Sequence, residues 1–153
     1  MVKLSILLFG LAACSTTPDT HWRCEHIASS SRLIYDNPNS HLKLEFLKLQ
    51  DGITAFAYTD LNSFSPSKED PQATELTVKL GDLVVKELVS LRKGNMRMKL
   101  GTKLTEQLIY ALKDQKEIAI LTSRVEHNSF EKAFSQFSNG TPWLINSIKG
   151  PLE

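Results

Sequence analysis

Hydrophobic and polar residues alternate with a period of two along much of residues 42–100, which is typical of strands with one buried face. Asp51-Gly52 separates the first two runs and is a strong signal for a tight turn. Residues 42–48 and 53–58 are therefore predicted to form a β-hairpin. The pattern continues in runs at residues 76–80, 83–91 and 96–100. Together these runs predict an antiparallel meander with one solvated face.

The period changes to that of a helix after Gly101. Thr102 is the expected N-cap of a first helix that ends near Asp114. Its apolar residues share one face: Leu104, Leu108, Ile109, Ala111 and Leu112. Residues 118–121 form a short apolar run and predict a central strand.

A second helix is predicted from Asn128, which stands three residues before Glu131 as in a capping box, to the stop signal Asn139-Gly140. Its apolar face consists of Phe130, Ala133, Phe134 and Phe137. We expect this face to pack in the core rather than to line a ligand groove.

Strands followed by helix, strand and helix predict an α+β fold. We expect an antiparallel β-sheet or sandwich of about six to eight strands, with two amphipathic helices in the C-terminal half. The first helix, with Lys116-Glu117-Ile118-Ala119-Ile120 and Phe130-Glu131-Lys132-Ala133-Phe134, resembles the end of exported β-sandwich proteins of the invasion-associated B type. This resemblance covers only the C-terminal part of the globular region and implies no activity.

The N-terminal stretch has the features of an export signal. Lys3 precedes an apolar run that ends in two small residues, Ala12-Ala13, which is typical of a signal peptide over residues 1–13. The run is too short to span a bilayer, which takes about 20 apolar residues. Leu11-Ala12-Ala13-Cys14 resembles the lipobox of bacterial lipoproteins. The resemblance implies cleavage between Ala13 and Cys14 and lipid attachment to Cys14.

Lipidation at Cys14 would anchor the protein stably, because two or more acyl chains hold a protein at a bilayer where one does not. Ser15 stands where the inner-membrane retention signal of that family has Asp, which implies the outer membrane. The alternative is an ordinary signal peptide that leaves Cys14 near the start. Residues 14–41 are predicted to be a polar tether, with a short strand at Leu33-Ile34-Tyr35, and residues 42–149 a single globular domain.

The chain has 18 basic and 17 acidic residues, and one of the basic residues, Lys3, belongs to the leader. The remainder is formally neutral and gives no argument for binding nucleic acid. If Cys14 carries lipid, Cys24 has no partner within the chain, because the sequence contains two cysteines. We expect a buried, inert thiol; an intermolecular disulfide is the alternative.

Few residues suggest chemistry. His21, Cys24 and His26 are close in sequence and are weak candidates for a zinc or copper site, but only His41 is near enough to be a fourth ligand. We therefore expect no metal and no other cofactor. No nucleophile motif, phosphate-binding loop or paired catalytic carboxylates occur, so no catalytic residue is predicted. A hydrolase built around His127 is the alternative.

Seven basic and two acidic residues lie between Lys79 and Lys103. Within this stretch Arg92, Lys93, Arg97 and Lys99 are a candidate patch for an anionic lipid or an acidic partner. The alternative is a solvated sheet face whose lysines discourage edge pairing.

The sequence therefore predicts a lipoprotein of the cell envelope, anchored through acylated Cys14 and facing the periplasm or the exterior. Its folded part is expected to bind or scaffold, with membrane lipid and an envelope protein or anionic lipid as partners. The alternatives are a lipidated periplasmic hydrolase and a metal-binding accessory protein.

Overall fold

The computed structural model describes residues 21–27, 30–59, 73–91 and 97–142. Within these ranges the chain forms nine strands in two antiparallel sheets, and two helices, which confirms the predicted α+β fold. The strands are β1 (Trp22–Ile27), β2 (Ser30–Asp36), β3 (Lys43–Leu49), β4 (Gly52–Tyr58), β5 (Ala73–Leu80), β6 (Leu83–Ser90), β7 (Arg97–Lys99), β8 (Ile118–Ile120) and β9 (Ser123–Val125). The helices are α1 (Thr102–Lys113) and α2 (Phe130–Asn139).

The five-stranded sheet has the order β1-β2-β3-β4-β7. The predicted hairpin is confirmed: Leu49 pairs with Gly52 at the end of β3 and β4, and Gly52 has a φ of 147°, which a side chain disfavours. The four-stranded sheet has the order β6-β5-β8-β9, and the predicted strand at residues 118–121 is its β8.

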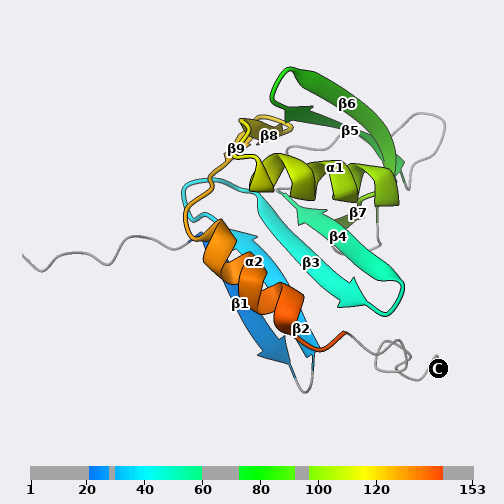
Figure 1. Cartoon of the computed structure of the whole chain (residues 1–153). Coiled ribbons are helices and arrows are strands. Elements are labelled where there is room, and N and C mark those ends of the chain that lie inside the picture. The colour runs from blue at the N-terminus through cyan, green and yellow to red at the C-terminus, as the bar shows by residue number, and fades with distance from the viewer. Residues whose placement is uncertain (1–20, 28–29, 60–72, 92–96, 143–153) are drawn as a thin grey trace, which may run out of the picture.

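Both helices pack on the same face of the five-stranded sheet. Figure 1 shows α2 along β1 and β2, and α1 between the two sheets, in contact with β4 and β5. Lys48 on β3 donates to the carbonyls of Ser138 (2.6 Å) and Gly140 (3.2 Å) at the C-terminal end of α2. A cation at this end also complements the helix dipole.

The core lies between the helices and the inward faces of both sheets. Trp22 on β1 is 1% exposed, packs against Tyr35 and Phe130 with ring centroids 5.0 Å away, and donates its indole N–H to the Glu126 carbonyl (2.6 Å). The predicted apolar faces of the helices are confirmed as core, except that Phe134 is only partly buried. No helix in the described parts of the chain is long and apolar enough to cross a bilayer.

The structure corrects the predicted boundary between tether and domain. Residues 22–27 and 30–36, placed in a polar tether over residues 14–41, form β1 and β2. The short strand expected at Leu33-Ile34-Tyr35 is the centre of β2, and all three side chains are fully buried. The folded part therefore includes residues from His21 onward rather than from residue 42.

Two further details differ from the sequence predictions. Residues 76–100 are not one meander, because β7 pairs with β4, and the pairing with the chain after β6 is limited to an isolated bridge between Leu91 and Met98. The helix N-caps are Gly101 and Ser129 rather than Thr102 and Asn128, and neither makes a side-chain capping bond. The helices still begin within two residues of the expected caps, because burial of their apolar faces fixes their positions.

Candidate binding surface

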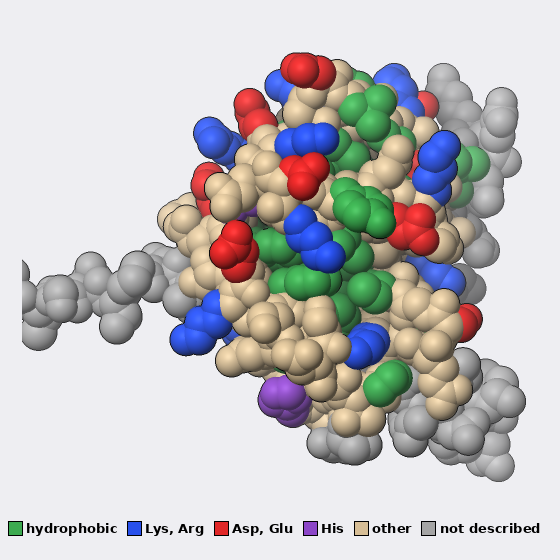
Figure 2. All heavy atoms as spheres, in the orientation of Figure 1, with side chains coloured by type: hydrophobic (Ala, Val, Ile, Leu, Met, Phe, Trp, Pro, Cys, Tyr) green, Lys and Arg blue, Asp and Glu red, His purple; other side chains and the backbone are tan. Residues whose placement is uncertain are grey.

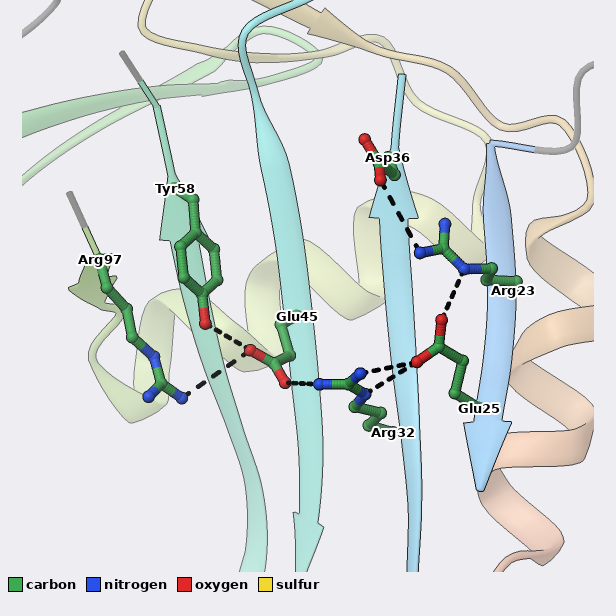
Figure 3. A network of polar contacts seen from close by, with 7 residues as sticks. All are labelled: Arg23, Glu25, Arg32, Asp36, Glu45, Tyr58 and Arg97. Atoms are coloured by element: carbon green, nitrogen blue, oxygen red, sulfur yellow. Dashed lines mark hydrogen bonds and ion pairs between the residues drawn. The ribbon is translucent and has the colours of Figure 1, made fainter. Parts of the chain in front are cut away.

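The five-stranded sheet has a second face, opposite the helices, which we call the outer face. In Figure 3 this face is toward the viewer and both helices lie behind the strands. Side chains alternate between the two faces of a sheet, so every second residue of β1, β2, β3, β4 and β7 lies on the outer face. A continuous polar network crosses all five strands here, formed by Arg23, Glu25, Arg32, Asp36, Glu45, Tyr58 and Arg97.

Glu45 on β3 is the centre of this network. Its side chain is 9% exposed and accepts hydrogen bonds from Tyr58 (2.5 Å) and Arg32 (3.0 Å). The Arg97 guanidinium lies 3.8 Å from Oε2 of Glu45, the oxygen that also accepts from Tyr58. Burial, followed by the hydrogen bond to the Glu45 carboxylate, raises the pKa of Tyr58 from 10.0 to about 12. The carboxylate is thus compensated by side chains from three other strands of the sheet, β2, β4 and β7.

Glu25 on β1 extends the network to the edge of the sheet. Its carboxylate accepts from Arg32 (2.7 Å) on β2 and from Arg23 (2.8 Å) on its own strand. Hydrogen bonds from Arg23 and Arg32 hold the pKa of Glu25 below its usual value. Arg23 also approaches Asp36 at 3.7 Å. Because Arg32 bonds Glu25 and Glu45 together, it links the edge of the network to its centre.

Apolar groups lie between the charges on the same face. Ile34 (0% exposed) pairs across the strands with Arg23, and Leu47 (8% exposed) pairs with Arg32. The aliphatic parts of the two arginine side chains thus lie beside these apolar residues, while their guanidinium groups bond the carboxylates of the network. The Arg97 guanidinium stacks 3.7 Å from the centroid of Phe56, an arrangement that favours a cation.

The structure describes two of the four members of the predicted cationic patch, Arg97 and Lys99. Arg92 and Lys93 lie outside the described residues. Arg97 is stacked on Phe56 and faces Glu45, so its charge is largely compensated, whereas Lys99 is exposed on the same face. The network holds three arginines and three carboxylates and is formally neutral. The outer face is therefore a mixed-charge surface with Lys43 and Lys99 as additional cations.

This composition suits contact with a protein. Arginine and tyrosine are enriched among the residues that dominate protein–protein binding, where planar, preorganised groups contact a partner at a small entropy cost. Arg32 and Arg97 keep 28% and 27% of their side chains exposed, so they are held in place and still accessible. This surface was not predicted from the sequence, because Arg23, Glu25 and Arg32 fall within the predicted tether.

The three metal candidates do not form a metal site. His21 is buried beside Tyr35, at 6.1 Å between ring centroids, and the Nδ1 of His26 hydrogen-bonds the Ser31 hydroxyl (2.7 Å). Burial raises the pKa of the Cys24 thiol, so the thiolate that would bind metal is disfavoured. Among the described residues no three metal-ligating side chains come together.

His127 lies in a shallow depression beside the start of α2 and bonds the Lys116 carbonyl through Nε2 (2.8 Å). A carbonyl accepts, so this nitrogen carries the proton, and the buried Nδ1 has no hydrogen-bond partner within the described residues. No described serine, cysteine or carboxylate bonds this ring. His26 does contact Ser31, but the Ser31 hydroxyl is buried against Gly140. The contact is so close that a Cβ added to Gly140 would collide with this hydroxyl. Among the residues that the structure describes, neither histidine contacts an accessible nucleophile.

Comparisons with models of known protein families, with curated proteins and with solved structures found no match.

Proposed function

We propose that this protein is a lipoprotein of the bacterial cell envelope, anchored through Cys14, and that its domain binds an envelope protein through the outer face of the five-stranded sheet. The observation that carries the proposal is the sequence Leu11-Ala12-Ala13-Cys14 at the end of a charged and apolar leader. A thiol at this position is the nucleophile that accepts a diacylglyceryl group, and small residues before it admit the peptidase.

The position of the domain supports the same proposal. Six residues, 15–20, separate Cys14 from His21, the first described residue before β1. The seven residue steps from Cys14 to His21 reach at most about 25 Å when extended. A lipid on Cys14 would thus hold the domain close to the membrane surface, within reach of other envelope proteins but with less freedom than a long tether gives.

The outer face supports a protein partner more than an anionic lipid. Arg32 and Arg97 are both engaged by carboxylates, whereas attraction to an anionic bilayer needs uncompensated cations. A partner surface that carries both signs of charge would match the alternation of Glu25, Arg32 and Glu45. Mixed charges of this kind favour selection among partners over raw affinity.

The anchor is tested by growing producing cells with an alkyne-tagged fatty acid and measuring label on the purified chain. We expect label on the wild type and on Cys24→Ala, and none on Cys14→Ala, which should leave the membrane fraction. Cys24→Ala is the matched control because it removes the other thiol. Labelled, membrane-bound Cys14→Ala protein would refute the anchor.

The binding face is tested with a photo-crosslinking amino acid placed in intact cells at Lys43 or Lys99 on the outer face, and at Lys132 on α2 as the control. All three side chains are at least partly exposed, so the substitutions preserve the fold. We expect discrete crosslinked species from Lys43 and Lys99 only. Equal crosslinking from Lys132, or none from the outer face, would reject this face as the binding surface.

A further inference from the structure

The strand β6 lies at an edge of the four-stranded sheet, with β5 as its neighbour on one side. The β5–β6 hairpin closes at Leu80 and Leu83 around a two-residue loop, in which Gly81 has a φ of 63° as a type II′ turn requires. The closing pair of such a hairpin is hydrogen-bonded, so residues 83, 85, 87 and 89 direct their backbone groups to β5. Val84, Lys86 and Leu88 direct theirs away from the sheet.

Among the described residues, Lys86 is the charged side chain that interrupts the apolar outward face of this edge, and its charge is paired with Glu75. In the described parts of the chain, no backbone hydrogen bond joins Val84, Lys86 or Leu88 to another element. The side chains of Val84 and Leu88 are also 56% and 63% exposed, on the same face of the strand. Figure 2 shows hydrophobic side chains open to solvent where β6 and α1 lie in Figure 1. Proteins normally blunt such edges, because a free strand with apolar side chains recruits another strand.

We propose that β6 pairs antiparallel with β6 of a second copy of this chain, which joins the two four-stranded sheets into one. A two-fold axis perpendicular to the sheet, at Lys86, places this residue opposite its counterpart. Val84 then lies opposite Leu88 of the partner, and Leu88 opposite the partner's Val84. Val84, Lys86 and Leu88 all become hydrogen-bonded positions, so the free backbone groups are satisfied.

The side chains favour this register over its neighbours. A shift of two residues in one direction places Val84 opposite the partner's Lys86. A shift of two residues in the other direction places Leu88 opposite Lys86 of the second copy, and Glu87 opposite Glu87 of the second copy. In the proposed register the exposed apolar residues meet each other, and apolar cross-strand pairs stabilise a sheet.

The charges at the centre are compensated in each copy. The Lys86 ammonium lies 3.1 Å from the Glu75 carboxylate on β5, so the two lysines do not meet as bare charges. On the inward side, a groove of about 460 Å³ between β6 and α1 is lined by Val85, Leu104 and Lys103. This groove gives room to the inward side chains of an added strand, while Glu87 of each copy accepts a hydrogen bond from the backbone N–H of its own Gly101 (2.6 Å). The match of exposed Val84 with exposed Leu88 across the two-fold axis favours a second copy over an unrelated strand.

Cysteine crosslinking in the full-length chain tests the register. Cys14→Ala and Cys24→Ala remove the native thiols, which also makes the test independent of lipidation. Lys86→Cys then places two thiols directly opposite, where the Cα separation of about 5.5 Å suits a disulfide. Val84→Cys is the matched control, because position 84 lies about 13 Å along the strand from its counterpart. Mixing Val84→Cys with Leu88→Cys protein should restore crosslinking.

We expect rapid disulfide dimers from Lys86→Cys, few from Val84→Cys alone, and mixed dimers from Val84→Cys with Leu88→Cys. Sedimentation of the cysteine-free chain should show a dimer whose share rises with concentration and disappears in Val84→Lys/Leu88→Lys. A monomer at every concentration would overturn the proposal. Equal crosslinking at 84 and 86 would also overturn it, because random collisions give that result.

Discussion

Replacing Glu45 by glutamine should destabilise the domain by about 2 kcal/mol. The substitution keeps the size of the side chain but removes the charge that Arg32 and Arg97 share and weakens the hydrogen bond from Tyr58. A hydrogen bond to a charged group is worth about 1.5–3 kcal/mol when its loss leaves a partner unsatisfied. Arg32 and Arg97 are 28% and 27% exposed, so water partly replaces the lost contacts and keeps the cost below that of a fully buried pair.

The measurement is urea unfolding at neutral pH, followed by circular dichroism. Glu75→Gln is the matched control, because the Glu75–Lys86 pair has a similar N–O distance of 3.1 Å but 60% and 63% exposed side chains. Exposed pairs contribute little, so we expect the control to change the free energy of unfolding by less than about 0.5 kcal/mol. Equal, small effects of the two substitutions would refute the view that the network stabilises the outer face.

Three further predictions follow from single residues. Trp22→Ala should lower the free energy of unfolding by about 3–5 kcal/mol, measured by thermal unfolding, because it removes a large side chain from the core. The same substitution in a polar tether would leave this free energy unchanged. Cys24 should react with iodoacetamide at pH 8 more slowly than a free thiol, because burial raises its pKa, and urea should abolish the difference. The stability that the Tyr58 hydroxyl contributes should be complete below pH 10 and lost as pH rises through about 12, since its pKa is raised in the folded state. Urea midpoints of wild type and Tyr58→Phe across this range should converge at the alkaline end; a constant difference would contradict the pKa assignment.

The spacing of hydrophobic residues predicted most of the strands and helices, because the burial of one face of an element determines both the period of its hydrophobic residues and where they occur in the chain. The hairpin of β3 and β4 and the apolar face of α1 could be read directly from alternation and from helical spacing. The strands β1 and β2 were harder to predict. Residues 22–36 mix charged side chains with Trp22 and Leu33, since this part of the sheet is apolar on the inner face and charged on the outer face.

The outer face could not be predicted because it depends on strand order and register. Glu45 meets Arg32 and Arg97 only when β3 pairs with β2 and when β7 pairs with β4 rather than with β6. Nothing local in residues 97–99 indicates that β7 joins the other sheet. The run of basic residues in the sequence therefore predicted Arg97 as part of a cationic patch. The pairing of β7 with β4 instead places Arg97 in a network that is formally neutral.

The anchor at Cys14 is the central claim of this account, and intact-mass spectrometry of the membrane-purified protein tests it most directly. We predict a chain that begins at Cys14 and carries the added mass of a diacylglyceryl group and an amide-linked acyl chain. A chain that still contains residues 1–13, or one that begins at Cys14 without added acyl mass, would contradict it.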